Sequence, residues 1–351
     1  MELLVITREF PPHVLGGISY HLKYLYEKLA SRGHEITVVA GKCTTADPDG
    51  DVTVNADIDI QWATYASQTG NHLQFPIAAK KALRNIDTST FDVALTHTPV
   101  PFSIGIPTIA KYHDCVQEER EFMQNDFNKI EEFFDVVINP SRRWVEQRSL
   151  TYADHYIFNS ELTRRMWEKN YTLSSESSVI YNGVDLSVFY PRENSKTNER
   201  YLLFVGGEER KGMSKVASLA QELEYPIYVA GESTIDQKNM KGLGKISQPE
   251  LAEYYTNAFA TVHPAKFEAF GNVILESLAC GTPVIVSKKC GASEIVDNSC
   301  GVISTDIKSS LARIAEIKQD ACVSKAEQYS WKKVAARTEE VISQVMTGSI
   351  Q

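Results

Sequence analysis

The sequence predicts an α/β protein built from two tandem, doubly wound domains with parallel sheets. Short continuous apolar runs alternate with longer segments of helical period, a pattern typical of buried parallel strands joined by crossover helices. A polar, turn-rich stretch at residues 191–200 interrupts this alternation, which then starts again. The length of 351 residues also fits about two domains, at roughly 100–200 residues each.

The first forty residues predict one strand–helix–strand unit. Residues 3–7 form an apolar run, and a loop over residues 8–17 follows it. A helical stripe of Ile18, Leu22, Leu25 and Leu29 comes next and is closed by Gly33, a typical C-terminal cap. Residues 35–40 form the second strand, and parallel strands joined in this way require a right-handed crossover.

The same patterns predict the remaining elements. In the first half we expect strands at 92–96, 108–112, 136–139, 155–159 and 178–181, with helices at 142–152 and 161–169. After the polar stretch we expect strands at 201–205, 226–230, 260–263 and 283–287, with helices at 212–222, 248–256, 272–280 and 331–346. The domains are therefore expected at 1–190 and 191–330, followed by a terminal helical segment at 331–351.

Charge and composition exclude several classes of function. The 36 basic and 45 acidic side chains give a net charge of -9, which argues against a nucleic-acid partner bound through its phosphates. The six cysteines form no C-x-x-C pair and indicate buried thiols in a reducing compartment. We expect a cytoplasmic monomer or homodimer. Two basic stretches, 80–84 and 142–144, fit either weak peripheral contact with an anionic membrane or ordinary solvated helices.

Several familiar motifs are incomplete. Residues 207–212 resemble a P-loop, but Met213 stands where its lysine belongs. The D-x-D of Asp57 and Asp59 is too short a match to predict a metal site. The pair Gly242 and Gly244 is expected in a polar loop rather than at a strand-to-helix turn. We therefore expect neither a P-loop nor a metal cofactor.

One segment, residues 262–286, carries the functional prediction. A strand leads to a loop that holds Glu268, and a helix that contains Glu276 begins near Asn272. The free N–H groups of Gly271, Asn272 and Val273 at the positive end of the helix dipole form an anion site. Two carboxylates beside it suit a ligand that also carries hydroxyl groups. A sugar linked through phosphate to a nucleoside has both features.

This segment, with its E-x7-E spacing, Phe270-Gly271 and Gly281-Thr-Pro-Val284, closely resembles the retaining glycosyltransferases of family 4. That family has the GT-B fold, in which two Rossmann-like domains face a cleft. The resemblance covers nearly the whole chain. It extends to the following motifs: Gly16-Gly17, Tyr112-His113-Asp114, Ala153-Asp154 with Asn159-Ser160, Asn182-Gly-Val-Asp185, Val205-Gly206 with Lys211-Gly212, and the final helix from Trp331.

The resemblance implies a role for each matching residue on the donor side. Glu276 would bind the ribose hydroxyls of a nucleoside-diphosphate sugar. Glu268, also expected to be catalytic, and the amides of the segment Phe270, Gly271, Asn272 and Val273 would together hold the donor sugar and its diphosphate. Lys211 would neutralise the leaving diphosphate, whose charge grows in the transition state. No metal is then required.

The resemblance also implies roles for residues of the first domain. Gly16 and Gly17 would admit the donor, and His113 would act catalytically over the sugar from the opposite domain. His97 also ends a predicted strand, and a ligand contact and a structural role are equally open for it. The final helix would pack back on the first domain.

One position departs from the family pattern. Gly207 stands where the family has an arginine after Val-Gly, and Arg210 is the candidate for the missing cation. The function expected from the sequence is metal-independent transfer of a sugar to a hydroxyl acceptor, by front-side attack. A sugar-nucleotide epimerase, a phosphorylase of the same fold and a non-catalytic nucleotide-sugar binder remain as alternatives. The sequence does not identify the nucleotide base, the donor sugar or the acceptor.

Overall fold

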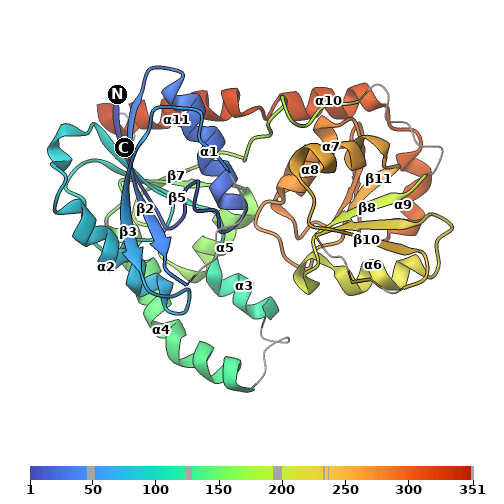
Figure 1. The fold of residues 1–351 in the computed structure, drawn as a ribbon, viewed down its shortest axis with the longest axis horizontal. Helices are drawn as coiled ribbons and strands as arrows, with labels where there is room; N and C mark the ends of the chain where they lie inside the picture. Colours follow the sequence, from blue (N-terminus) through green and yellow to red (C-terminus); the bar gives the residue numbers. More distant parts are fainter. Residues whose placement is uncertain (46–51, 124–128, 193–199, 232–233, 236, 349–351) are drawn as a thin grey trace. The chain divides into compact units, whose positions relative to one another are not determined.

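The computed structural model describes residues 1–45, 52–123, 129–192, 200–231, 234–235 and 237–348, with the side chains of residues 121–134 left out. Two parallel sheets organise the chain, one of seven strands and one of six (Figure 1). Each belongs to its own compact unit. Unit 1 comprises Met1–Ile180 and Val334–Gln351, and unit 2 comprises Tyr181–Lys333.

The sheet of unit 1 has the strand order β3-β2-β1-β4-β5-β6-β7. Its strands are β1 (Glu2–Thr7), β2 (Glu35–Cys43), β3 (Asp59–Tyr65), β4 (Val93–Thr96), β5 (Thr108–Tyr112), β6 (His155–Phe158) and β7 (Glu176–Val179). Every residue of β4, β5 and β6 is buried, which explains why these strands appear in the sequence as unbroken runs. The strand order reverses between β1 and β4, so a ligand crevice is expected beyond their carboxyl ends.

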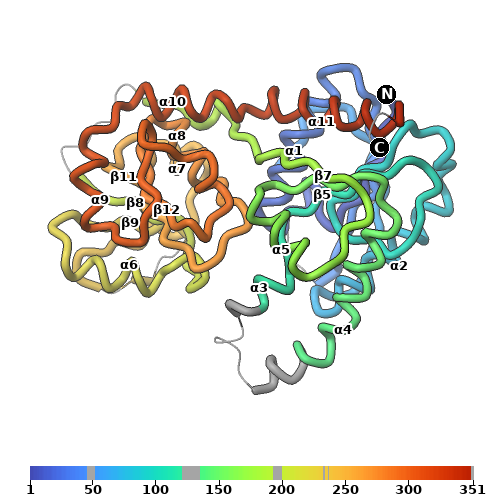
Figure 2. Tube along the Cα trace, turned by 180° about the vertical axis from the view of Figure 1, so that it is seen from behind, coloured from blue at the N-terminus to red at the C-terminus, as the bar shows by residue number. Residues whose placement is uncertain are grey.

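Among the described residues, six helices belong wholly or mainly to unit 1. They are α1 (Gly17–Ala30), α2 (Asn71–Leu83), α3 (Val116–Met123), α4 (Lys129–Thr151), α5 (Glu161–Asn170) and α11 (Trp331–Thr347), with a 3-10 turn at Thr88–Thr90. The final helix α11 runs beside the end of α1 (Figure 2), where Glu339 contacts both Arg32 and His34. No helix in the described ranges is both long and apolar enough to cross a bilayer.

The sheet of unit 2 has the strand order β10-β9-β8-β11-β12-β13. Its strands are β8 (Leu202–Val205), β9 (Ile227–Ala230), β10 (Met240–Gly244), β11 (Ala260–His263), β12 (Val284–Val286) and β13 (Gly301–Ile303). Its helices are α6 (Met213–Ala220), α7 (Gln248–Asn257), α8 (Asn272–Ala279), α9 (Ile307–Ile314) and α10 (Gln319–Glu327), with 3-10 turns at Glu209–Lys211 and Gly291–Ile295.

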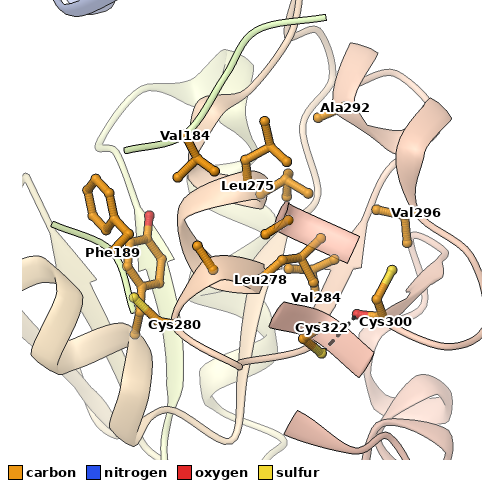
Figure 3. Close-up of a cluster of buried hydrophobic side chains, with 14 of the residues drawn as sticks. Val184, Phe189, Leu275, Leu278, Cys280, Val284, Ala292, Val296, Cys300 and Cys322 are labelled. Atoms are coloured by element: carbon orange, nitrogen blue, oxygen red, sulfur yellow. Dashed lines mark hydrogen bonds between the residues drawn. The ribbon is translucent and has the colours of Figure 1, made fainter. Parts of the chain in front are cut away.

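One hydrophobic core of unit 2 fixes the helix that carries the E-x7-E segment. Leu275 and Leu278 of α8 pack with Val284 of β12 in a cluster of buried side chains (Figure 3). Cys280, Cys300 and Cys322 belong to the same cluster. All six cysteines of the chain are buried and free, as the spacing predicted.

The strand predicted at residues 136–139 is wrong. These residues lie inside α4, which spans Lys129–Thr151 and includes Pro140. The β-branched pair Val136 and Val137 suggested a strand, but both side chains are exposed, whereas Asp135 and Asn139 are buried. Burial that repeats after four residues follows the helical period rather than the strand period.

Two other segments hold more structure than the sequence indicated. The region between Thr44 and Lys80, for which the sequence predicted no strand or helix, contains β3 and most of α2. Gly242 and Gly244, expected in a polar loop, lie in β10 at the edge of the second sheet. The unit boundary at Tyr181 precedes the polar stretch 191–200, of which residues 193–199 lie outside the described residues.

Candidate functional site

Two loops of unit 2 meet beyond the carboxyl ends of neighbouring strands. β8 pairs with β11, and the chain continues from these strands in opposite directions across the sheet. A doubly wound sheet binds its ligands at such a reversal of strand order. The backbone amides of Lys266 and Phe267 donate to the carbonyl of Arg210, at 2.8 and 3.2 Å. These bonds fix the loop after β11 against the loop after β8.

Two glycines allow the close packing around Lys211 in the first of these loops. A Cβ on Gly206 would lie 2.6 Å from Cδ of Lys211, so the lysine side chain lies directly against this bare backbone. A Cβ on Gly212 would lie 2.5 Å from the carbonyl oxygen of Pro264, so the two loops approach too closely for any side chain there. Lys211 Nζ lies 3.2 Å from a carboxylate oxygen of Glu208.

Arg210 links the two loops through its side chain. Its guanidinium lies 3.3 Å from the carboxylate of Glu208 and 3.4 Å from that of Glu268. A cation therefore lies beside the first glutamate of the E-x7-E pair, although Gly207 removes the arginine expected from the family pattern. The contact with Glu268 makes Arg210 a member of this site.

A buried histidine lies behind Glu268. His263 ends β11, is only 1% exposed, and has its Nε2 3.8 Å from Glu268 Oε2. Burial, together with the nearby positive charges of Lys211 and Arg210, lowers the pKa of His263 to about 3. The ring is therefore neutral, and its approach to Glu268 is not an ion pair.

The amino end of α8 contributes backbone donors. Gly271 precedes α8 in the left-handed conformation (φ 93°), and no side chain caps the helix. Among the described residues, the amides of Gly271, Asn272 and Val273 have no recorded protein acceptor. A Cβ on Gly271 would lie 2.7 Å from Cys290 Sγ and 3.3 Å from Glu268 Cγ, so the cap is packed against both. These donors and the helix dipole favour an anion at this point.

Glu276 lies one turn further along α8. The hydroxyl of Tyr255 donates to Glu276 Oε2 at 2.9 Å. Burial raises the pKa of Glu276 to about 7, although the Tyr255 hydrogen bond and the positive charge of Lys211 oppose this rise. Near neutral pH, the Glu276 carboxyl group is therefore present in both its neutral and its ionised form.

A histidine network lies at the corresponding strand ends of unit 1. His97 follows β4, His113 follows β5, and both are buried. His97 Nδ1 lies 2.9 Å from His113 Nε2, and its Nε2 lies 2.6 Å from the hydroxyl of Tyr26. Burial lowers the pKa of both histidines, to about 3 for His113. A neutral His97 serves both bonds by donating at one ring nitrogen and accepting at the other.

His21 of α1 adjoins the same network. Its ring centroid lies 4.7 Å from that of His113, in an edge-on arrangement. One potential metal-ligand atom from each of His21, His97 and His113 lies within 4.8 Å of the other two. Among the described residues, this is the only cluster of three or more His, Cys, Asp or Glu side chains close enough together to hold a metal ion. The hydrogen bond between His97 and His113 occupies one ring nitrogen of each.

A pocket of about 800 Å³ opens beside these histidines in unit 1. His97, His113, Ile18 and Glu9 line it. Gly16 and Gly17, at the start of α1, are exposed next to Ile18, and a Cβ on Gly16 would touch nothing within 4 Å. The two glycines and His113 are thus carried by one end of the unit 1 sheet.

The structure therefore gathers the predicted site residues into two groups. Unit 2 brings together the donor-side residues, and unit 1 carries Gly16, Gly17 and His113. Four residues of these groups were not predicted from the sequence: His263 and Glu208 in unit 2, and Glu9 and His21 in unit 1. His263 could have been found by the rule that singled out His113, because both histidines lie at the carboxyl end of a strand. The other three lacked such a signal.

Curated proteins that resemble the chain are enzymes that transfer sugars. A glycogen synthase of Mycobacterium tuberculosis is 23% identical, with 81% of this chain and 77% of the relative covered. A phosphatidyl-myo-inositol mannosyltransferase of Mycolicibacterium smegmatis is 26% identical, with 77% and 72% covered.

Solved structures show the same fold at lower identity. A sucrose-phosphate synthase from Thermosynechococcus elongatus superposes with a TM-score of 0.79 at 18% identity, over 99% of this chain and 100% of the other. The Anabaena protein HepE in complex with UDP superposes with a TM-score of 0.70 at 16% identity, over 98% and 100%. The two tandem parallel sheets are therefore the GT-B fold.

Two family models match overlapping parts of the chain. Residues 15–188 match the model described as Glycosyltransferase Family 4. Residues 168–333 match the model described as Glycosyl transferases group 1. Together they span both units and the segments that carry Gly16, His113, Lys211, Glu268 and Glu276. The protein belongs to the family 4, group 1 glycosyltransferases of the GT-B fold.

Proposed function

We propose that this glycosyltransferase moves a sugar from a nucleoside-diphosphate sugar to a hydroxyl acceptor with retention of configuration. The observation that carries the proposal is the convergence in unit 2 of Lys211, Arg210 and the uncapped start of α8 beside Glu276. Solved relatives add support, since HepE is described in complexes with UDP and with UDP-glucose.

Each donor-side group has a distinct task in this proposal. Ionised Glu276 accepts hydrogen bonds from the ribose hydroxyls, because a carboxylate has only acceptor sites. The amides of Gly271, Asn272 and Val273 bind the diphosphate, as the start of a helix does for anions. Glu268, next to these amides, accepts from a hydroxyl of the donor sugar.

Lys211 and Arg210 stabilise the leaving group. Negative charge accumulates on the diphosphate as the glycosidic bond breaks, so cations held beside it act more strongly in the transition state than in the ground state. Glu208 and Glu268 hold these two side chains in place before the donor arrives. With these cations and one helix dipole in place, we propose that the reaction needs no metal ion.

His113 acts on the sugar as a neutral hydrogen-bonding group. Its low pKa, about 3, keeps it uncharged over the working range, and His97 orients its ring. An uncharged imidazole does not repel the positive charge that develops on the sugar. We propose that the leaving phosphate removes the proton from the attacking hydroxyl on the same face, which preserves the anomeric configuration.

The proposal is tested by Lys211→Ala, with Lys215→Ala as the matched control because Lys215 is an exposed lysine of α6. Release of nucleoside diphosphate from a panel of nucleotide sugars should fall by about 100- to 1,000-fold in Lys211→Ala. It should stay unchanged in Lys215→Ala and after chelation of divalent metals. Full turnover in Lys211→Ala would contradict the assignment, and loss of turnover with chelator would contradict metal independence.

A further inference from the structure

Three buried side chains from separate elements of unit 1 form one chain of hydrogen bonds. Tyr26 belongs to α1, His97 follows β4 and His113 follows β5. The hydroxyl of Tyr26 lies 2.6 Å from His97 Nε2, and His97 Nδ1 lies 2.9 Å from His113 Nε2. The three residues are 0%, 5% and 8% exposed. We call this chain of Tyr26, His97 and His113 the imidazole relay.

The orientation of the two imidazole rings suits a direct hydrogen bond between them. Their planes differ by only 23°, and their centroids are 5.2 Å apart. An imidazole carries both its N–H bond and its nitrogen lone pair in the plane of the ring. Because the planes of His97 and His113 are nearly parallel, the N–H of one ring can point at the lone pair of the other, and hydrogen bonds prefer such a straight approach.

The direction of the first bond follows from the burial of Tyr26. A phenol hydroxyl can donate or accept. Burial raises the pKa of Tyr26 well above its ordinary value, so the hydroxyl keeps its proton. Its only recorded partner among the described residues is His97 Nε2. If the hydroxyl accepted from His97, its own proton would be buried without an acceptor, which folded proteins avoid. Tyr26 therefore donates to His97 Nε2.

This direction passes along the relay to His113. Burial lowers the pKa of both histidines, so each ring is neutral and carries a single proton. Because His97 accepts at Nε2, its proton is on Nδ1 and is donated to His113 Nε2. The proton of His113 is therefore on Nδ1. The reverse direction would leave the Tyr26 hydroxyl proton unpaired, which corresponds to a preference of about 5- to 100-fold for the direction described.

We propose that Tyr26, acting through His97, fixes the tautomer in which His113 offers its Nδ1–H to a ligand in the pocket of unit 1. His113 lines this pocket of about 800 Å³, and its Nδ1 has no recorded partner in the described part of the chain. Tyr26 and His97 are positioning residues, since they act through His113. This role rests on the proposed function, in which His113 acts on the sugar.

The relay makes His113 a hydrogen-bond donor and prevents it from acting as a base. Its one in-plane lone pair, on Nε2, accepts from His97, and its other nitrogen already carries a proton. The ring therefore has no site left to take a proton from an acceptor hydroxyl. It can donate only to a lone pair on the bound ligand, such as that of a sugar oxygen. The proton of the acceptor must then go elsewhere, as in the proposed transfer to the leaving phosphate.

Nuclear magnetic resonance tests the tautomer directly and does not depend on catalysis. In full-length protein with 15N-labelled histidine, long-range 1H–15N correlation spectra distinguish an Nδ1–H ring from an Nε2–H ring. The signals of His113 are those absent from the spectrum of His113→Ala. In the wild-type protein at neutral pH, His113 should be in the Nδ1–H form. An Nε2–H or a doubly protonated His113 would overturn the proposal, whatever the activity of the protein.

Tyr26→Phe removes the hydroxyl and keeps the ring, and Tyr24→Phe is the matched control on a second buried tyrosine of α1. Without the hydroxyl the relay has no preferred direction, so the Nδ1–H fraction of His113 should fall to about half or less. The kcat should fall by the same factor, with the KM for the nucleotide sugar nearly unchanged. Tyr24→Phe should alter neither quantity. An unchanged tautomer in Tyr26→Phe would overturn the relay, and an altered tautomer with unchanged kcat would overturn its role in transfer.

A double-variant comparison separates this role from a purely structural one. In a His113→Ala background, Tyr26→Phe should cause no further loss in the residual release of nucleoside diphosphate, because Tyr26 acts only through His113. Losses that multiply in the double variant would show that Tyr26 acts by another route and would overturn the proposal. Failure of the wild-type protein to turn over any nucleotide sugar would overturn the proposed function instead and leave the tautomer result intact.

Discussion

At the scale of single residues, the proposed donor-side site contains buried polar groups whose states lower the stability of the folded protein. Glu276 is a largely buried carboxyl group whose only recorded donor among the described residues is Tyr255. His263 is a buried neutral imidazole with no recorded hydrogen bond in the same part of the chain. Buried polar groups are normally satisfied, and exceptions gather where a ligand completes them. Both residues lie beside the proposed diphosphate site.

Glu276→Gln should stabilise the ligand-free protein in a pH-dependent way. The pKa of Glu276 rises from 4.5 to about 7 on folding, so its ionisation disfavours the folded state, and this cost grows as the pH rises through that interval. The free energy of unfolding of the variant relative to wild type should increase by about 2 kcal/mol between pH 5 and pH 8.

Thermal and urea unfolding at the two pH values measure this difference. Nucleoside diphosphates that stabilise wild type should stabilise Glu276→Gln less, because a neutral amide accepts fewer hydrogen bonds from ribose. A difference that did not change with pH would show that Glu276 is ionised normally in the folded protein.

At the scale of elements, the helices nearest the proposed ligands begin with glycine. Gly16, Gly70, Gly212 and Gly271 precede α1, α2, α6 and α8, and none of these helices has a side-chain cap. By contrast, Ser160, Ser247 and Asp306 cap α5, α7 and α9 through their side chains. A helix start without a side-chain cap leaves backbone N–H groups available to a ligand.

Gly271→Ala and Gly16→Ala should therefore behave differently. Gly271 has a φ of 93°, and a Cβ there would meet Cys290 Sγ at 2.7 Å, so the substitution should cost about 1–3 kcal/mol of stability and disturb the start of α8. Gly16 has extended backbone and open space around it, so its substitution should leave stability unchanged.

Donor kinetics complete this comparison. If Gly16 contacts the donor as predicted, Gly16→Ala raises the KM for the nucleotide sugar while the melting temperature stays at the wild-type value. Unchanged kinetics in Gly16→Ala would remove Gly16 from the site, and an unchanged melting temperature in Gly271→Ala would contradict the packing at α8.

At the scale of the whole molecule, the two units carry different parts of the proposed site. Unit 2 contains Lys211, Arg210, Glu268 and Glu276, whereas unit 1 contains the histidine network and the large pocket. Each unit has hydrophobic clusters of its own. We therefore expect binding of the nucleotide alone to involve unit 2, and we expect the acceptor chemistry to require unit 1 as well.

Hydrogen exchange followed by mass spectrometry tests this division. A saturating nucleoside diphosphate should slow exchange at residues 206–212 and 270–276 by at least tenfold, because a ligand that binds only the folded form suppresses local opening in proportion to its excess over Kd. Exchange in the sheet of unit 1 should change much less. Protection confined to unit 1 would contradict the assignment of the nucleotide site.

The sequence by itself determined the strand–helix alternation and the E-x7-E segment. Strands such as β4 and β5 are buried on both faces and therefore leave unbroken apolar runs. Glu268, Gly271 and Glu276 lie on one continuous loop and helix, so their proximity is a local property of the chain. The resemblance to family 4 depended on motifs of this local kind.

Only the tertiary structure decided which distant residues meet. Arg210 reaches Glu268 because β8 and β11 are neighbours in the sheet, and neither residue carries that information in its own surroundings. The strand wrongly predicted at 136–139 failed for a related reason, since a short β-branched run fits a strand or a helix until burial selects one. The pattern of helices and strands follows from residues that are neighbours in the sequence. The candidate site, by contrast, follows from packing between residues that are far apart in the sequence.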